Sequence, residues 1–241
     1  YLDAGAFNNA SDGAFVLTAV EADPAGVVLT ADEVAWQLTN NFERFFGFAN
    51  QGANVRWTAY DVADAGGRTI TYNDDSLDAA GRNLFRNALQ MWGDVTGITF
   101  SYAATAAEIV ADDGAGGIRA YNSNSTDANG NILGSSLQVT TGWLANFGTG
   151  FDSYSFETYI HELGHSLGLG HGGNYNGSAT YGTDNFYVND SQHLSIMSYM
   201  QSRSDEFSTA TSGHNTYVNA EFRYVLTPMI ADILAMSNMY G

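Results

Sequence analysis

Three histidines and a glutamate are concentrated in one short stretch of the chain. Residues 161–171 read HELGHSLGLGH and contain three of the five histidines in the 241-residue sequence. On a helix, His161 and His165 stand one turn apart on the same face, where both imidazoles can bind one metal ion. Glu162 lies to the side of this pair, from where it can act on a metal-held water without binding the metal.

The third histidine requires the helix to end inside the motif. Gly168 tolerates the left-handed backbone conformation of a sharp turn, which brings His171 back as a third ligand. Three neutral imidazoles leave one coordination position open, which is typical of a catalytic zinc site and not of a structural one. The pattern therefore predicts Zn²⁺ bound by His161, His165 and His171, with Glu162 as the general base of a hydrolytic reaction.

The residues around the motif predict the helix that carries it. In a helix over 155–168, the apolar residues fall within one arc of the helical wheel: Phe156, Tyr159, Ile160, Leu163 and Leu167. This arc is the expected core face, and the histidine pair falls roughly opposite it.

Two more helices are predicted upstream. Thr30 and Glu33 form a capping-box pattern before apolar residues at helical spacing, which indicates a helix over 31–46. An apolar stripe over 77–95 predicts a second helix, with candidate N-caps at 74–76.

Alternating apolar residues predict strands at 68–72, 98–102, 108–111 and 137–141. The stretch 112–136 is rich in turn-forming residues and is expected to be mostly loop. This order of elements predicts an α+β fold in which helices back a twisted mixed sheet.

The two ends of the chain are patterned more weakly. Residues 1–28 are rich in Ala, Gly and Asp and are expected to form an N-terminal arm. Residues 29–241 are expected to form one domain, whose upper lobe extends to about residue 171 and whose lower lobe is smaller and irregular. In the lower lobe, 172–195 predict an extended loop and Pro228 stands in the first turn of a last helix. The zinc is expected in the cleft between the lobes.

The charge balance argues against two classes of partner. The chain has 26 acidic and 8 basic residues, all eight of them arginine, for a formal net charge of −18. Nucleic acid and anionic membrane surfaces bind basic patches, so we expect neither as a partner. An acidic surface keeps molecules apart, and we expect a monomer. The absence of cysteine excludes disulfides and thiolate ligands. The sequence also lacks a run of 18 apolar residues, which a membrane span would need.

Two stretches together resemble the metzincin metallopeptidases. Residues 195–199 read SIMSY, which is similar to the methionine turn that follows the histidine motif in these enzymes. The resemblance implies that Met197 forms an apolar floor beneath the zinc and is not a ligand. It also implies that Tyr199 binds the zinc in the resting enzyme and supports the oxyanion during attack, as in the serralysin and astacin branches.

Further stretches resemble the serralysins, peptidase family M10B, over about residues 29–241. They are residues 29–33, 91–100, 127–131, 175–176 and 228–241. The resemblance implies a secreted, extracellular bacterial zinc endopeptidase that hydrolyses proteins and peptides by a zinc-activated water, with Glu162 as general base. By position, the strand at 137–141 is then the edge strand to which a peptide can add.

Three features depart from the serralysin pattern. Gly172 and Gly173 stand where Pro-Gly is usual, and Met200 stands where Trp is usual. No calcium-binding repeat of the Gly-Gly-x-Gly-x-Asp kind is present, so we expect the protease domain without the C-terminal repeat domain of the family.

Three alternatives stay open. The chain could be a non-catalytic binding or adhesion module on a metzincin scaffold. It could also belong to another metzincin branch, such as the astacin-like enzymes, although these are disulfide-bonded. Calcium is a second candidate cation, because Asp127, Asn129 and Asn131 are spaced as in a calcium loop. Gly130 is misplaced for such a loop, however, and a plain turn is favoured.

Overall fold

The structure is a computed structural model that describes residues 27–46, 55–57, 69–201, 213–215, 217–218 and 223–241. The predicted N-terminal arm lies outside these residues except for its last two positions. The division of the remaining chain into two lobes at residue 171 stays a prediction.

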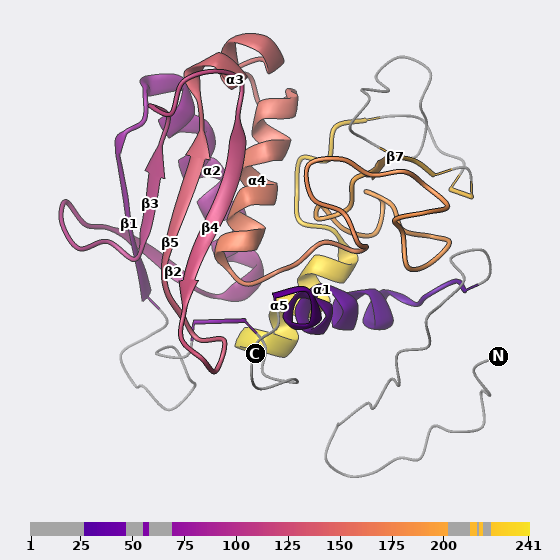
Figure 1. The fold of residues 1–241 in the computed structure, drawn as a ribbon. Helices are drawn as coiled ribbons and strands as arrows, with labels where there is room; N and C mark the ends of the chain where they lie inside the picture. The colour runs from indigo at the N-terminus through magenta and orange to yellow at the C-terminus, as the bar shows by residue number, and fades with distance from the viewer. Residues whose placement is uncertain (1–26, 47–54, 58–68, 202–212, 216, 219–222) are drawn as a thin grey trace.

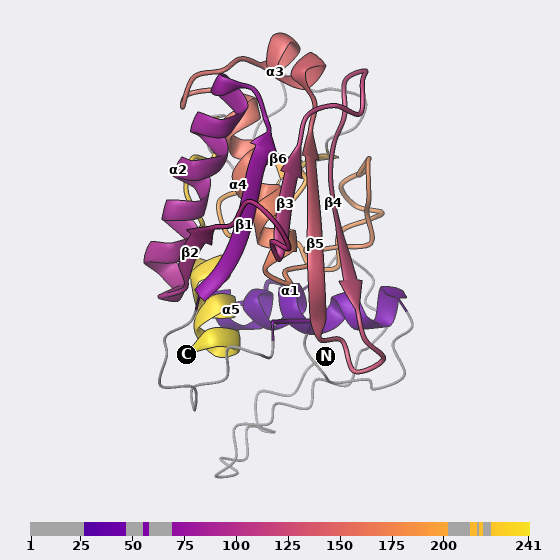
Figure 2. The same cartoon turned by 90° about the vertical axis from the view of Figure 1, so that its left-hand side faces the viewer.

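A five-stranded sheet forms one side of the molecule (Figures 1 and 2). Its strands are β1 (Thr69–Ser76), β2 (Thr99–Tyr102), β3 (Ile109–Asp112), β4 (Ala120–Thr126) and β5 (Ile132–Val139). The order across the sheet is β2-β1-β3-β5-β4, with β4 antiparallel to β5 and the other neighbours parallel. The predicted mixed sheet of an α+β fold is therefore confirmed.

Two expectations about the strands are wrong. Residues 112–136 are not mostly loop, because they contain β4 and the first part of β5. The polar sequence of β4, AYNSNST, has no apolar alternation from which a strand could be predicted. The strand predicted at 137–141 is the end of β5, which lies between β3 and β4. The edge strand on this side of the sheet is therefore β4.

Five helices accompany the sheet in the described part of the chain. They are α1 (Ala31–Phe46), α2 (Ala79–Thr96), α3 (Thr141–Phe147), α4 (Tyr154–Ser166) and α5 (Ile230–Tyr240). The capping box of α1 is confirmed, since the Thr30 N–H donates to the Glu33 carboxylate at 2.7 Å and the Glu33 N–H donates to Thr30 Oγ1 at 3.3 Å. The short helix α3 is absent from the sequence-based prediction.

Helices α2 and α4 pack against each other and against the sheet (Figure 2). The apolar arc predicted for the motif helix is buried throughout, from Phe156 to Leu167. The Nδ1 atoms of His161 and His165 lie outside this arc and hydrogen-bond to backbone carbonyls that follow the helix. Packing of the arc therefore determines which way the histidines point.

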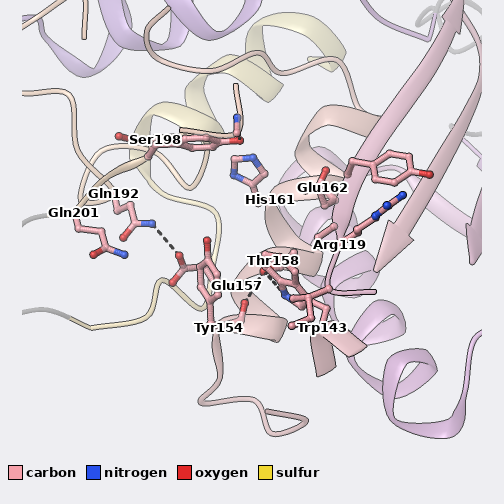
Figure 3. Close-up of a pocket in the computed structure, with 15 residues that line it drawn as sticks. Arg119, Trp143, Tyr154, Glu157, Thr158, His161, Glu162, Gln192, Ser198 and Gln201 are labelled. Carbon is pink, nitrogen blue, oxygen red and sulfur yellow. Dashed lines mark hydrogen bonds between the residues drawn. The ribbon is translucent and has the colours of Figure 1, made fainter. Parts of the chain in front are cut away.

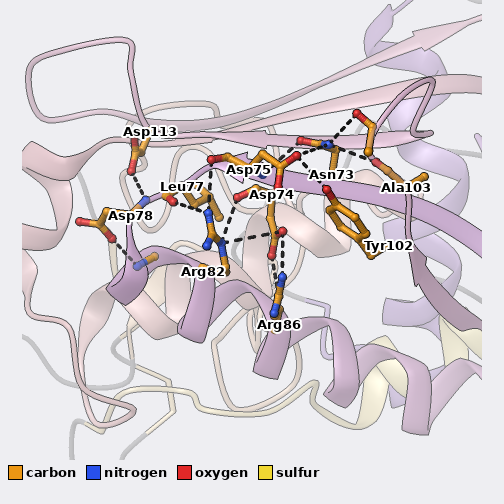
Figure 4. A network of polar contacts seen from close by, with 12 residues as sticks. Asn73, Asp74, Asp75, Leu77, Asp78, Arg82, Arg86, Tyr102, Ala103 and Asp113 are labelled. Atoms are coloured by element: carbon orange, nitrogen blue, oxygen red, sulfur yellow. Dashed lines mark hydrogen bonds and ion pairs between the residues drawn. The ribbon is translucent and has the colours of Figure 1, made fainter.

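An ion pair joins β1 to α2 (Figure 4). Asp74 is fully buried, and it accepts hydrogen bonds from Arg86 Nε at 2.7 Å and from Arg86 Nη2 at 3.1 Å. The expectation that 74–76 supply the N-cap of α2 is wrong, because these residues belong to β1. Asp78 is the cap and accepts from the Gly81 N–H at 2.7 Å.

The C-terminal segment is mostly irregular, as predicted. Residues 172–195 contain no helix or extended strand, and β6 (Met200–Gln201) pairs with β7 (Gly213–His214). Pro228 does not stand in the first turn of the last helix, because α5 begins at Ile230 after the N-cap Met229. Helix α5 packs beside α1 (Figure 1). In the described residues we find no helix with the length and apolarity needed to cross a membrane.

Candidate metal centre

The three histidines of the motif converge. The Nε2 atom of His171 lies 3.0 Å from Nε2 of His165 and 3.3 Å from Nε2 of His161. Each histidine offers one nitrogen to a common point, and these nitrogens all lie within 4.8 Å of one another. A tetrahedral zinc with bonds of 2.0–2.1 Å holds its ligand nitrogens about 3.3 Å apart, so the spacing suits this ion.

The second nitrogen of each ring determines what the first can do. The Nδ1–H of His161 donates to the Ile196 carbonyl at 2.8 Å, and that of His165 donates to the Leu169 carbonyl at 2.7 Å. A neutral imidazole that donates through Nδ1 carries only a lone pair on Nε2. Lone pairs therefore face one another in the centre, and a bound cation would satisfy them.

Burial keeps the three rings neutral. It lowers the pKa of His161 to about 4 and that of His165 to about 3, and it lowers the pKa of His171 well below its usual range. In His165 and His171 the neighbouring histidines add to the effect. Neutral imidazole is the form that binds metal, so the centre is ready for a cation at neutral pH.

The turn after α4 returns the third histidine as predicted. Gly168 has φ of 99°, and a Cβ at this position would overlap the carbonyl of Val55. The Gly170 N–H then donates to the Leu38 carbonyl in α1 at 2.7 Å. Glycine at 168 is needed for both the left-handed backbone and the close approach of the Val55 backbone.

Glu162 lies beside the centre in a buried position, with 7% of its surface exposed. Burial raises the pKa of its carboxyl to about 8, although a backbone hydrogen bond from Asn122 in β4 lowers it. A carboxyl group with a raised pKa is a stronger base than an exposed one, which suits proton transfer near neutral pH.

Met197 lies directly beneath the motif helix. It is fully buried, and its sulfur occupies the space in which a Cβ of Gly164 would stand. The turn that contains it is held from α5: Asp232 accepts from Ser195 Oγ at 2.6 Å and from the Ile196 N–H at 2.9 Å. Because the Ile196 carbonyl accepts from His161, α5 supports the orientation of the first histidine through this turn.

Tyr199 lies against two of the histidines. Its ring centroid is 4.6 Å from that of His171 and 5.7 Å from that of His161, and it stacks on Tyr175 at 4.9 Å. Among the described residues, its hydroxyl accepts one long contact of 3.5 Å, from the Gly177 N–H. Burial raises the pKa of Tyr199 to about 12. The buried Met200 packs in the same cluster with Tyr175 and Tyr199.

Two buried aspartates that support the centre were missed from the sequence. Asp190 accepts from Ser198 Oγ at 2.7 Å and from the Tyr175 hydroxyl at 3.0 Å, so it holds the neighbours of Tyr199. Asp232 holds the methionine turn. For Asp232, the first turn of the last helix was the available clue, since an acidic residue there can bond back to the N-cap. Asp190 lies in an irregular loop with no local pattern.

The candidate calcium loop forms a turn that the Asp127 carboxylate holds. Asp127 Oδ1 accepts from the N–H groups of Asn129 and Asn131 at 2.8 and 2.9 Å, and Oδ2 accepts from Asn131 Nδ2 at 2.7 Å. The turn therefore uses its carboxylate internally. Among the described residues, the three motif histidines are the cluster that could hold a metal.

A cavity of about 400 Å³ opens beside the centre (Figure 3). His161, Glu162 and Tyr199 line it together with residues of β4, of α3, of the first turn of α4 and of the segment 177–201. A substrate in this cavity would therefore contact the edge strand β4 and the candidate metal centre together.

Comparison with protein families identifies the chain. The family model of peptidase M66 matches residues 91–232, which is more than half of the sequence. The chain belongs to the peptidase M66 family.

Curated relatives of this M66 chain include named metalloproteases and serralysins. It is 32% identical over 162 residues to the metalloprotease AprA of Pseudomonas entomophila (strain L48), an alignment covering 64% of this chain and 32% of that protein. It is 27% identical over 235 residues to a serralysin C of Dickeya chrysanthemi, covering 93% of this chain and 45% of the relative. The predicted similarity to serralysins is thus confirmed, and the chain spans less than half the length of these relatives.

A solved structure is also similar to the M66 chain. High choriolytic enzyme 1, a hatching enzyme zinc-protease of Oryzias latipes (medaka fish), is 18% identical, with a TM-score of 0.47 over 77% of this chain and 94% of that one.

Proposed function

We propose that this chain is a zinc-dependent endopeptidase with His161, His165 and His171 as zinc ligands and Glu162 as general base. The observation that carries the proposal is the convergence of three imidazole Nε2 atoms beside a buried carboxyl at an open cavity. Membership of a peptidase family supports the same conclusion.

The chemistry divides between the metal and the chain. When bound, zinc polarises the scissile carbonyl and makes a water molecule more acidic. Glu162 takes the proton of the attacking water and passes it to the departing amine. The carbonyls of Ile196 and Leu169 hold His161 and His165 in the neutral tautomer that binds through Nε2.

Tyr199 is proposed as a fifth zinc ligand in the resting enzyme and as a donor to the oxyanion during attack. Its weakly held hydroxyl supports this role, because it can leave its resting contact at little cost. We expect Tyr199→Phe to lower kcat about 100-fold with KM changed less than about threefold, which steady-state kinetics measures. Tyr102→Phe, at an exposed tyrosine far from the cavity, is the matched control. Unchanged kcat in Tyr199→Phe would remove this residue from the mechanism.

The substrates and setting are part of the proposal. Proteins and peptides are the proposed substrates. The chain itself is proposed to be a secreted, extracellular monomer with no nucleic-acid or membrane partner. The names of the curated relatives support a protease, and the net charge of −18 supports the absence of anionic partners.

Zinc content and casein hydrolysis test the proposal together. We expect about one zinc per chain, with activity lost on chelation and restored by zinc. Glu162→Gln should retain the zinc and lose hydrolysis by at least about 1,000-fold. A wild-type protein that holds zinc but cleaves nothing would support the binding-module alternative. A Glu162→Gln protein that cleaves at the normal rate would refute the assigned mechanism.

A further inference from the structure

A second carboxyl lines the cavity away from the metal centre. Glu157 lies one helical turn before His161 on α4 and is only 3% exposed, yet it contributes to the cavity wall. Figure 3 shows it beside Tyr154 and Gln192, apart from Glu162. The proposed hydrolysis does not use this residue.

Neutral groups hold the Glu157 carboxyl in place. Gln192 Nε2 donates to Oε1 at 2.8 Å, and the Val225 N–H donates to Oε2 at 2.7 Å. Each carboxylate oxygen can accept two hydrogen bonds, so one position remains at each oxygen. Burial raises the pKa of Glu157 to about 8, and among the described ion pairs none involves it. A cation that enters the cavity would find an uncompensated buried carboxyl.

Among the described residues that line the cavity, the one arginine is poorly placed to compensate Glu157. Arg119 is exposed, and Figure 3 places it on the opposite side of Thr158 from Glu157. Water and salt screen an exposed charge, whereas a buried carboxyl acts through a medium of low dielectric constant. A guanidinium or ammonium group bound beside Glu157 favours the ionised form of its carboxyl, so inside the cavity the field of this carboxylate should dominate.

The walls near Glu157 suit a long side chain with a charged end. Tyr154 and Trp143 provide aromatic surface, against which the methylene stem of arginine or lysine can lie. Gln192 and Gln201 place side-chain amides in the same wall, and amide oxygens accept hydrogen bonds from such a cation.

We propose that this part of the cavity is a subsite for an arginine or lysine side chain of the substrate, and that Glu157 selects it. The inference rests on the proposed function, because the cavity leads to Glu162. A leucine side chain would leave the Glu157 carboxyl without a partner of opposite charge, and an aspartate would bring a second acidic group beside it. The substrate class is thus a peptide with a basic residue close to the cleaved bond.

Binding to an inactive protein tests the subsite without relying on cleavage. The probes are acetylated pentapeptide amides of glycine and alanine with Arg, Lys, Leu or Asp at the centre. They are titrated by calorimetry into the zinc-loaded 241-residue chain carrying Glu162→Gln. We expect the Arg and Lys probes to bind about tenfold more tightly than the Leu probe, with the Asp probe weakest.

Three further substitutions in the Glu162→Gln background assign the preference. Glu157→Gln should reduce the Arg-to-Leu affinity ratio to about one, and Glu157→Asp should retain part of it because the charge remains. Asp94→Asn removes one exposed charge on α2 and should leave the ratio unchanged. If Glu157→Gln fails to fold, the Glu157→Asp protein still tests the proposal, because its Arg-to-Leu affinity ratio should fall below that of the parent protein. A ratio of one in the parent protein overturns the proposal, and so does an unchanged ratio in a folded Glu157→Gln protein.

A second experiment separates this inference from the proposed function. The wild-type chain is incubated with a mixed peptide library, and Arg and Lys are counted beside the cleaved bonds by mass spectrometry. Cleavage without basic enrichment, together with equal probe affinities, overturns the subsite and leaves the peptidase intact. No cleavage but a Glu157-dependent Arg preference refutes the peptidase and supports the subsite. A preference for Asp that is lost in Arg119→Ala would assign selection to Arg119 and overturn the proposal.

Discussion

Buried carboxyl groups are held differently in the sheet and in the C-terminal segment. In the sheet, Asp74 is fully buried, and Arg86 donates to both of its oxygens at 2.7 and 3.1 Å. In the C-terminal segment, Asp190 and Asp232 are equally buried, but the groups that donate hydrogen bonds to their carboxylates are hydroxyls and backbone N–H groups. The described ion pairs involve only Asp74.

The difference matters because the carboxyls without a cation surround the candidate site. Asp232 holds the turn that orients His161, Asp190 holds the neighbours of Tyr199, and Glu157 lines the cavity. Burial raises the pKa of both aspartates to about 6 and that of Glu157 to about 8. The Asp74 pair joins two scaffold elements, whereas the other carboxyls link the scaffold to the site. Structure and function should therefore respond differently to changes in the two regions.

The largest effect is expected at Asp232. Asp232→Asn leaves one acceptor oxygen for the Ser195 hydroxyl and for the N–H groups of Ile196 and Met229. At least one buried donor then loses its partner, which should lower the free energy of unfolding by about 2–3 kcal/mol. The loosened Ile196 carbonyl should also reduce zinc affinity at least about tenfold. Urea unfolding and chelator competition measure the two quantities, and an unchanged zinc affinity would separate Asp232 from the centre.

The pH dependence of stability should show a smaller effect at Glu157. Its pKa is raised from an ordinary 4.5 to about 8 in the folded protein, so the folded state keeps a proton that the unfolded state loses within this window. The contribution is fully present below pH 4.5 and is lost as pH rises towards 8. Relative to wild type, Glu157→Gln should therefore gain about 2 kcal/mol between pH 6 and pH 8.

The comparison with wild type isolates Glu157 from the other titrating groups. The histidines and the two aspartates are common to both proteins, and their contributions cancel in the difference between the unfolding curves. Parallel curves from pH 5 to pH 8 would mean that Glu157 is ionised in the folded protein.

The smallest effect is expected at the ion pair of the sheet. Arg86→Met removes the main partner of Asp74, but the Arg86 side chain is half exposed and Arg82 Nε remains 3.9 Å from Asp74. We expect a loss of about 1 kcal/mol in the free energy of unfolding and no change in zinc affinity. A fall in zinc affinity as large as that in Asp232→Asn would abolish the contrast between the two regions.

Much of the fold could be predicted because the deciding patterns are local. The motif helix, its buried arc, the capping box of α1 and the end of α2 before Gly97 all depend on residues within a few positions of one another. Strand β4 could not be predicted, since it is an edge strand whose polar residues pair with β5 and reach α4. Asn122 Nδ2, for example, donates to Ser166 Oγ at 2.8 Å.

The sequence by itself determined the three histidines and the glutamate of the candidate site. Helical periodicity places His161 and His165 together, and Gly168 permits the turn to His171, because these relations depend only on neighbouring backbone. Tertiary structure alone decided what surrounds them. Asp232 and Ser195 are 37 residues apart, Ile196 and His161 are 35 apart, and Val225 and Glu157 are 68 apart. Contacts over such separations follow from how α5 and the irregular C-terminal segment pack against α4, and no short-range pattern encodes that packing.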